Sequence, residues 1–357
     1  AKKHGIRVKL CIEHFREIDP DSGYPMTWAT NTLHHRSQGG TADSLDDWFD
    51  GADSREQFCR KLDFFRDRYG DCPTVFGWEL WNEVNAVRST RYMPWTKAML
   101  GELHERFPKN MAMQSLGSYD SDWCVTHYNE LMGMEGNDVA QVHRYLDLGA
   151  KLKECRGPVD LLAADAVSIV RGITTDRPIL LAESGAVEPK HSGPFKLYEK
   201  DRDGIILHDV LFTPFFAGAA GPGHCWHWDV YVDRNNLWWQ FDRFAEAVEG
   251  IDPGKENFRP KMIEQPQFRA YALQGTDTTL VWCRDSASNW RTELEEEKQP
   301  ETIVGAELEV AGILPSGSAD GEPAVDFYDP WTDRHSKGKI VNGRILLPGF
   351  KRSLVVR

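Results

Sequence analysis

Several features that would assign a function class are absent from this 357-residue sequence. No stretch approaches the roughly 18 consecutive apolar residues of a membrane-spanning helix, so we expect no membrane as a partner. No C-x-x-C pair occurs among the seven cysteines, which excludes zinc-ribbon and thioredoxin-type sites. Anionic residues outnumber cationic ones, and the net charge of −13 argues against nucleic acid as a partner.

Motifs for phosphates and metals are absent as well. No Gly-rich phosphate loop follows a predicted strand, which argues against a nucleotide site. His104-Glu105 opens like the zinc motif H-E-x-x-H, but Pro108 stands where the second His is required. His34-His35 and the pair His224 and His227 have no third ligand at a suitable spacing. We therefore expect no metal and no cofactor.

Aromatic side chains, by contrast, are abundant, with 13 Trp, 10 Tyr and 17 Phe. Such a load suits a ligand with apolar faces, for example a sugar. Hydrophobic residues make up 41% and charged residues 27% of the chain, a composition that predicts a folded globular protein. At this length the chain can bury a sizeable core in one large domain or two ordinary ones.

Apolar runs of strand length alternate with helical patterns up to about residue 230. The predicted strands are residues 5–11, 75–81, 111–116, 139–145 and 179–182, with a sixth inside 215–228. Buried strands separated by helices predict a parallel sheet covered by helices, either an open doubly wound sheet or a (β/α)₈ barrel. The missing phosphate loop favours the barrel.

After about residue 260 the pattern changes to short strands separated by turn signals, such as Asn342-Gly343 and Pro315-Ser316-Gly317. The predicted strands are residues 278–284, 307–310, 325–328, 344–347 and 353–356. This pattern is typical of a small β-sandwich. We therefore expect a (β/α)₈ catalytic domain over 1–255 and a β-sandwich accessory domain over 262–357.

Reactive side chains cluster at the carboxyl ends of the predicted strands, where the active sites of barrels lie. Glu83 follows the second strand and Glu183 the fifth, and a Glu is rarely buried there without a partner or a function. Other residues share these strand ends: His14, Asn82, His143, Tyr145, Trp226 and Trp228. Each His or Trp taken alone would more often be a core residue, but together they indicate one site.

Two carboxylates that face one cleft suit the cleavage of a glycosidic bond. One protonates the leaving oxygen and the other attacks the anomeric carbon, and a separation of about 5 Å leads to retention through a covalent glycosyl-enzyme. Glu79 precedes Glu83 by four residues, so both side chains can point to the same side of the strand, and its role is open.

The segment Phe76-Gly77-Trp78-Glu79-Leu80-Trp81-Asn82-Glu83 resembles the fourth-strand signature of clan A glycoside hydrolases, and the chain is similar to family 5-like cellulases and mannanases. The resemblance implies that residues 5–11 are the third strand of the barrel. The first two β/α units, with the hallmark Arg of the second strand, are then missing, and we expect upstream polypeptide to complete the barrel. Residues 327–333 (FYDPWTD) resemble a YDPxTG turn of small β domains appended to such barrels.

The same resemblance implies roles for the site residues. Glu83 would be the acid/base and Glu183 the nucleophile, oriented by Tyr145. Asn82 would bind the sugar 2-hydroxyl. The remaining hallmark positions are expected to bind the sugar or the carboxylates: His14, His143, Trp226 and Trp228. The loop 16–50, with Tyr24, Trp28 and Trp48, is predicted to lie over the cleft, either to shape subsites or as a simple lid.

These observations predict a retaining glycoside hydrolase that cleaves β-glycosidic bonds in a neutral oligo- or polysaccharide of the β-mannan or β-glucan type. Such a substrate suggests a secreted or periplasmic protein. The alternative is a carbohydrate-binding pseudoenzyme barrel without hydrolysis. The presence of both Glu83 and Glu183 favours the enzyme, because a binding module would normally lose one of them.

Overall fold

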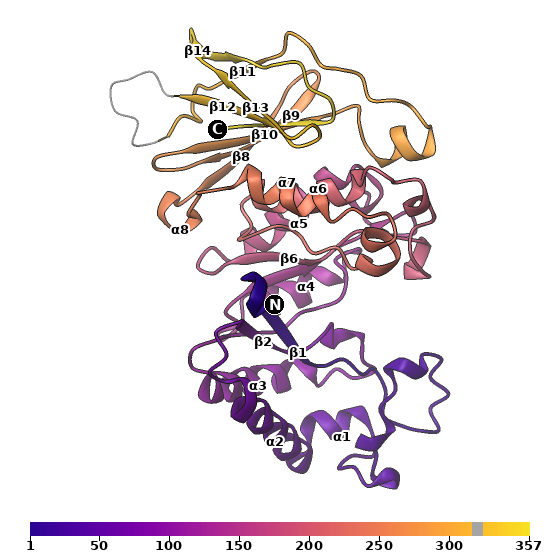
Figure 1. Cartoon of the computed structure of the whole chain (residues 1–357). Helices are drawn as coiled ribbons and strands as arrows, with labels where there is room; N and C mark the ends of the chain where they lie inside the picture. Colours follow the sequence, from indigo (N-terminus) through magenta and orange to yellow (C-terminus); the bar gives the residue numbers. More distant parts are fainter. Residues whose placement is uncertain (316–323) are drawn as a thin grey trace. The chain divides into compact units, whose positions relative to one another are not determined.

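The computed structural model describes residues 1–315 and 324–357. The chain divides into two compact units (Figure 1). The first comprises Ala1–Tyr119, Trp123–His143 and Val170–Pro178, and the second comprises Asp120–Asp122, Arg144–Ile169 and Ile179–Arg357. Within the described ranges, no helix combines the length and the apolar character needed to cross a membrane.

The first unit repeats a strand–helix pattern. Strands β1 (Val8–Glu13), β2 (Val75–Trp81) and β3 (Met111–Met113) form a parallel sheet in that order. The remaining elements are α1 (Leu45–Asp50), α2 (Ala52–Tyr69), α3 (Tyr92–Arg106), α4 (Cys124–Met132) and β4 (Ala140–His143). Parallel neighbours joined by helices make this the β/α repeat that the apolar runs predict.

An aromatic cluster forms part of the core of this unit. Trp48 on α1 contacts Trp81 at a ring-centroid distance of 5.3 Å and Trp95 at 5.5 Å. Trp48 is 1% exposed, so its ring belongs to the core and is not available to a ligand. Its position follows from α1, which turns the apolar face of a short helix inward. Trp28 of the same connection is 68% exposed.

The second unit begins with barrel elements. These are β5 (Leu146–Asp147), most of α5 (Val159–Ile173), β6 (Ile179–Glu183), β7 (Ala186–Val187), α6 (Ile205–Phe216), α7 (Trp239–Ala247) and α8 (Pro253–Glu256). β5 and β7 pair in parallel. The sixth predicted strand is reduced to one parallel bridge between Ser184 and Cys225, because residues up to Phe216 continue the helix α6.

Helix α6 is buried along its whole length, and its sequence IILHDVLFTPFF is apolar on nearly all sides. A helix on the outside of a barrel normally keeps a polar face toward solvent. Here the C-terminal strands cover that face, and Trp282 on β10 stacks on Phe212 at 5.8 Å. Figure 1 shows α6 next to these strands. The apolar pattern of α6 is therefore explained by burial between two layers.

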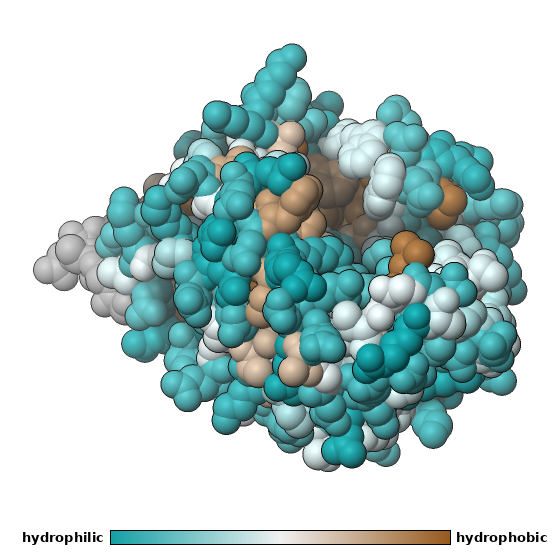
Figure 2. Space-filling model, turned by 90° about the horizontal axis from the view of Figure 1, so that it is seen from below, coloured by the Kyte–Doolittle hydropathy of each residue, from teal (hydrophilic) through white to brown (hydrophobic). Residues whose placement is uncertain are grey.

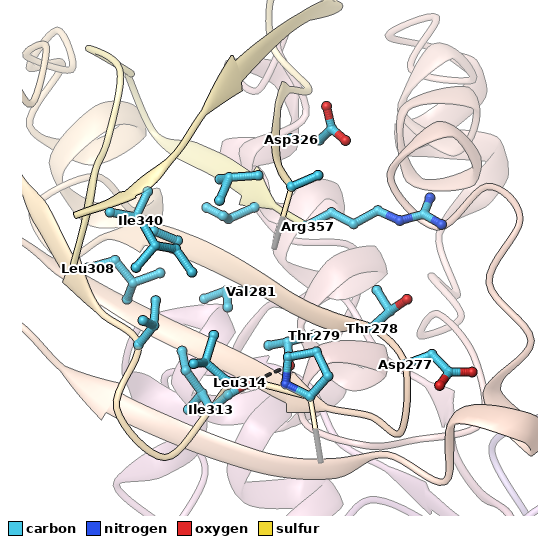
Figure 3. Close-up of a pocket in the computed structure, with 16 residues that line it drawn as sticks. Asp277, Thr278, Thr279, Val281, Leu308, Ile313, Leu314, Asp326, Ile340 and Arg357 are labelled. Atoms are coloured by element: carbon cyan, nitrogen blue, oxygen red, sulfur yellow. Dashed lines mark hydrogen bonds between the residues drawn. The ribbon is translucent and has the colours of Figure 1, made fainter. Parts of the chain in front are cut away.

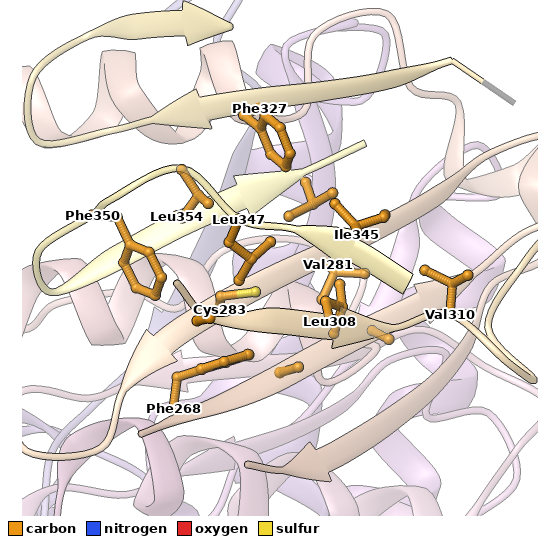
Figure 4. Packing of buried hydrophobic residues seen from close by; sticks show 14 of the residues in the cluster. Phe268, Val281, Cys283, Leu308, Val310, Phe327, Ile345, Leu347, Phe350 and Leu354 are labelled. Atoms are coloured by element: carbon orange, nitrogen blue, oxygen red, sulfur yellow. The ribbon is translucent and has the colours of Figure 1, made fainter. Parts of the chain in front are cut away.

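The C-terminal strands form two antiparallel sheets that share one apolar core (Figure 4). The larger sheet has the order β13-β12-β16-β10-β9-β8 and the smaller one the order β11-β15-β14. Their bounds are β8 (Arg259–Glu264), β9 (Phe268–Gln274), β10 (Thr279–Asp285), β11 (Glu307–Glu309), β12 (Val325–Asp329), β13 (Arg334–Gly338), β14 (Ile340–Val341), β15 (Arg344–Leu346) and β16 (Ser353–Val356).

The turn between β14 and β15 is the Asn342-Gly343 hairpin that the sequence predicts, with both residues at positive φ. The predicted turn Pro315-Ser316-Gly317 falls partly on residues 316–323, which lie outside the described ranges. A cavity of about 460 Å³ opens between the two sheets (Figure 3). It is lined mainly by aliphatic side chains and contains none of the predicted site residues.

Buried polar contacts join the C-terminal strands to the helices of the same unit. Asp160 on α5 accepts hydrogen bonds from Arg269 at 2.6 Å and from Tyr271 at 2.8 Å. Asp209 on α6 accepts two from Arg284, at 2.6 and 3.2 Å. Because all these side chains are buried, removal of one partner would leave an uncompensated charge away from water. The face that Figure 2 shows, in contrast, is largely hydrophilic.

Candidate active site

Glu83 lies two residues after the end of β2 and has an unusual backbone. Its φ of 53° and ψ of 55° lie in the left-handed region, which a residue with a side chain seldom adopts. The Glu83 N–H donates to Ser115 Oγ at 3.0 Å, and the Glu83 carbonyl accepts from the N–H of Ala86 at 2.9 Å. These contacts stabilise a conformation that would otherwise be costly.

The peptide groups just before Glu83 are held equally firmly. The Trp81 carbonyl accepts from the Gln114 side chain. The Asn82 N–H donates to the Glu13 carbonyl at 2.8 Å, and the Asn82 carbonyl accepts from Arg16 at 2.6 Å. The turn after β2 is therefore defined by residues from two other segments of the first unit.

Glu79 lies beneath this turn and is fully buried. Its carboxylate accepts hydrogen bonds from Lys9 and from the Ser115 hydroxyl. Ser115 thus donates to Glu79 and accepts from the Glu83 N–H through one oxygen. The role that the sequence leaves open for Glu79 is that of a support below Glu83.

The Glu83 carboxylate has two further neighbours in the first unit. His143 Nδ1 lies 3.0 Å from Oε1, and Arg16 Nη2 lies 3.5 Å from Oε2. His143 is itself buried, and its backbone N–H donates to the Tyr128 hydroxyl at 3.3 Å. The Glu83 side chain remains 22% exposed, so a ligand can reach it.

Glu183 ends β6 in the second unit. The Tyr145 hydroxyl donates to its Oε2 at 2.9 Å, and Tyr145 is buried. The His191 and Tyr145 rings pack in a T-shaped arrangement at a centroid distance of 5.2 Å. His191 Nε2 in turn lies 3.7 Å from a carboxylate oxygen of the buried Asp147. Tyr145 therefore contacts Glu183, as the resemblance implies, and is itself supported.

Two Trp side chains follow the Ser184–Cys225 bridge in the second unit. Trp226 is 55% and Trp228 59% exposed, so both rings are available to a ligand. His227 lies between them in sequence, and burial lowers the pKa of its imidazole. Since both Trp residues are exposed, the geometry leaves either ring able to stack on a sugar.

The remaining predicted site residues are His14 and Asn82. His14 is exposed and makes no hydrogen bond or ion pair within residues 1–315 and 324–357. The Asn82 side chain is half-buried, next to Glu83 in the chain. Arg16, Ser115 and His191 are contacts that the sequence reasoning missed. Arg16 and Ser115 lie in loops and His191 in a three-residue 3₁₀ turn, where no periodic pattern predicts which side chain turns inward.

Comparison with known proteins identifies the fold. No protein-family model matches the chain, and no curated protein sequence matches it. Among solved structures, an endo-β-1,4-mannanase from Thermotoga petrophila is similar with 14% identity over 98% of this chain and 73% of that chain, at a TM-score of 0.50.

Two further structures are similar at lower scores. A family 30 endoxylanase from Clostridium papyrosolvens C71 has 10% identity, covering 87% of this chain and 71% of that chain at a TM-score of 0.49. GH5_18 from Streptomyces cattleya has 14% identity, covering 64% and 53% at 0.45. The chain has the fold of the clan A glycoside hydrolases, which confirms the predicted α/β-barrel class.

Proposed function

We propose that this protein is a retaining glycoside hydrolase that cleaves β-glycosidic bonds in a neutral oligo- or polysaccharide. The observation that carries the proposal is the setting of Glu83. A carboxylate at the end of a barrel strand is held in a left-handed backbone conformation by Ser115, Arg16 and the segment before it. Strain of this kind is found where a side chain must be presented in one position. The clan A fold supports the same reading.

In the first step Glu183 attacks the anomeric carbon while Glu83 protonates the glycosidic oxygen. The C–O bond to the leaving sugar breaks, and that sugar departs as an alcohol. Glu183 becomes a neutral glycosyl ester, and Glu83 is left as a carboxylate. The Tyr145 hydroxyl, 2.9 Å from Glu183 Oε2, would hold the nucleophile in line.

In the second step a water molecule attacks the same carbon, and Glu83 takes its proton. The ester bond to Glu183 breaks, which restores the nucleophile as a carboxylate and Glu83 as an acid. Two displacements at one carbon retain its configuration. The mechanism requires the two carboxyl groups to lie about 5 Å apart.

Other site residues would bind the sugar. Asn82 would hydrogen-bond the 2-hydroxyl, an interaction that strengthens in the transition state. His14 and His143 would bind the sugar or the carboxylates, and Trp226 or Trp228 would stack on its apolar face. A β-mannan or β-glucan chain fits these groups, and a mannanase is among the similar structures.

We also propose that polypeptide outside this sequence completes the barrel with two strand–helix units. β1 has β2 as its only neighbour among the described strands, its Cys11 is exposed, and Ile6 just before it is 56% exposed. Such an edge pairs readily with another strand. In this arrangement residues 1–255 belong to the catalytic domain, and residues 262–357 form a β-sandwich accessory domain.

The mechanism can be tested with azide as a replacement nucleophile. For a β-glycoside substrate, Glu83→Ala should yield β-glycosyl azide, because Glu183 still forms the ester that azide then displaces. Glu183→Ala should yield the α-glycosyl azide by one direct displacement. The reverse pattern would exchange the two roles. Sugar binding without any turnover by the wild type would identify the protein as a carbohydrate-binding pseudoenzyme.

A further inference from the structure

A second polar group lies beside Glu83 and takes no part in the steps above. Asn85 is half-buried, and its Oδ1 accepts a hydrogen bond from the N–H of Gly117 at 2.7 Å. Because a backbone N–H bonds only to an acceptor, this contact decides which way the carboxamide is turned. The Nδ2 group is then the carboxamide atom that does not bond to the Gly117 N–H. Its N–H donors have no hydrogen-bond partner within the part of the chain that the structure describes.

Gly117 leaves room next to both polar groups. A Cβ added at Gly117 would lie 3.6 and 3.7 Å from the carboxamide atoms of Asn85 and 3.7 Å from the carboxyl carbon of Glu83. These are ordinary van der Waals distances, so a methyl group would fit there without a clash. It would, however, occupy the space that the two side chains border. Asn85, Gly117 and Glu83 are all partly exposed.

We propose that Asn85 and Gly117 form the leaving-group subsite, in which Asn85 Nδ2 donates a hydrogen bond to a hydroxyl of the departing sugar. The inference rests on the proposed function. If Glu83 is the acid, the departing sugar must lie in the space next to its carboxyl group. The sugar whose glycosidic oxygen receives the proton must lie close to the Glu83 carboxyl. Asn85 and Gly117 border the same space, one offering a donor and the other making room.

This arrangement selects a hydroxylated leaving group. A carboxamide N–H recognises the lone pairs of a hydroxyl oxygen. A fluoride leaving group offers no hydroxyl and needs almost no room. The ratio of kcat/KM on a sugar leaving group to kcat/KM on fluoride therefore measures the contribution of Asn85 and Gly117, with the glycone and the nucleophile held constant.

The experiment compares β-linked manno- or gluco-hexaose, whichever the wild type cleaves, with the β-glycosyl fluoride of the same sugar. Asn85→Ala and Asn85→Asp should each lower the ratio about tenfold, the value of one lost hydrogen bond. Gly117→Ala should lower it as well, because its methyl group takes up the space. Asn129→Asp, an exposed site on α4 with the same change of charge, should leave the ratio as it is.

The variant Asn85→Asp separates binding from support of the loop. Its carboxylate would still accept from the Gly117 N–H but could not donate to a hydroxyl. A wild-type ratio in Asn85→Asp with a lowered ratio in Asn85→Ala would therefore overturn the inference. If the wild type cleaves neither substrate, the proposed function fails instead. Calorimetric binding of the hexaose then decides: weaker binding by Asn85→Asp supports the contact, and equal binding refutes it.

Discussion

Glu83 and Glu183 both stand at the end of a barrel strand, but the chain holds them by different means. Glu83 has a left-handed backbone, and side chains from two other segments bind the peptide groups around it. Glu183 continues β6, and the Tyr145 hydroxyl contacts its carboxylate. The difference suits the proposed roles. An acid/base must face the leaving oxygen and later a water, whereas a nucleophile needs one line of attack.

The sharpest way to break this comparison is to vary the leaving group. Glu83→Ala should lower kcat/KM on an oligosaccharide about 10²- to 10⁴-fold, because a poor leaving group needs a proton. The same variant should lose far less on a dinitrophenyl glycoside, which departs without one. Glu183→Ala should fail on both substrates. Equal losses of Glu83→Ala on the two substrates would contradict its role as the acid.

Removal of the Ser115 hydroxyl, which supports Glu83 from below, should have the next largest effect on activity. Ser115→Ala removes the acceptor of the Glu83 N–H and a donor to buried Glu79, so kcat should fall about 10- to 100-fold with little change in KM. Ser115→Thr keeps the hydroxyl and should recover much of the loss. Ser192→Ala, in an exposed turn, is the matched control. A Ser115→Ala variant that changes only the melting temperature would show a purely structural role.

A change in the residue that contacts Glu183 should lower activity less. Tyr145→Phe removes the hydrogen bond to Glu183 and keeps the ring that His191 packs on, so kcat should fall about tenfold. The loss should be the same for good and poor leaving groups, because Tyr145 acts on the nucleophile. Tyr69→Phe, on an exposed ring of α2, serves as the control. A loss of activity that grows with poorer leaving groups would show that Tyr145 acts on the acid and not on the nucleophile.

The smallest effect concerns a buried polar residue with no expected part in catalysis. His208 on α6 lies between Gln240, 2.9 Å away, and Ser353, 2.8 Å away, and burial lowers the pKa of its imidazole well below its ordinary value. A depressed pKa means that the folded state binds the proton less well than the unfolded state. The stabilising contribution is therefore present above about pH 6.5 and is lost as the pH falls.

Between about pH 7.5 and about pH 5, His208 should cost the wild type unfolding free energy that His208→Gln does not lose. Urea unfolding of both proteins at the two pH values measures the difference. The kinetic constants near neutral pH should be alike in the two proteins. If the wild type and His208→Gln lose the same unfolding free energy between the two pH values, groups other than His208 determine how stability depends on pH.

Local patterns predicted much of this molecule. Residues 75–81 and 353–356 are strands with the predicted bounds, and Asn342-Gly343 is the predicted hairpin turn. The strands β8 and β13 were missed because exposed edge strands carry little apolar signal. Of the last predicted barrel strand, inside 215–228, the first two residues belong to α6, since a fully apolar run does not distinguish a buried helix from a strand, and Cys225 forms a parallel bridge with Ser184.

The sequence by itself determined which reactive residues follow the strands, because a strand end is a local feature of the chain. Glu83, Tyr145 and Glu183 could be named for that reason. Only the tertiary structure decided that Glu83 adopts a left-handed backbone and that Ser115 and Arg16 hold it there. Those contacts join residues that lie far apart in the sequence, and no periodicity or composition specifies which distant side chains will meet.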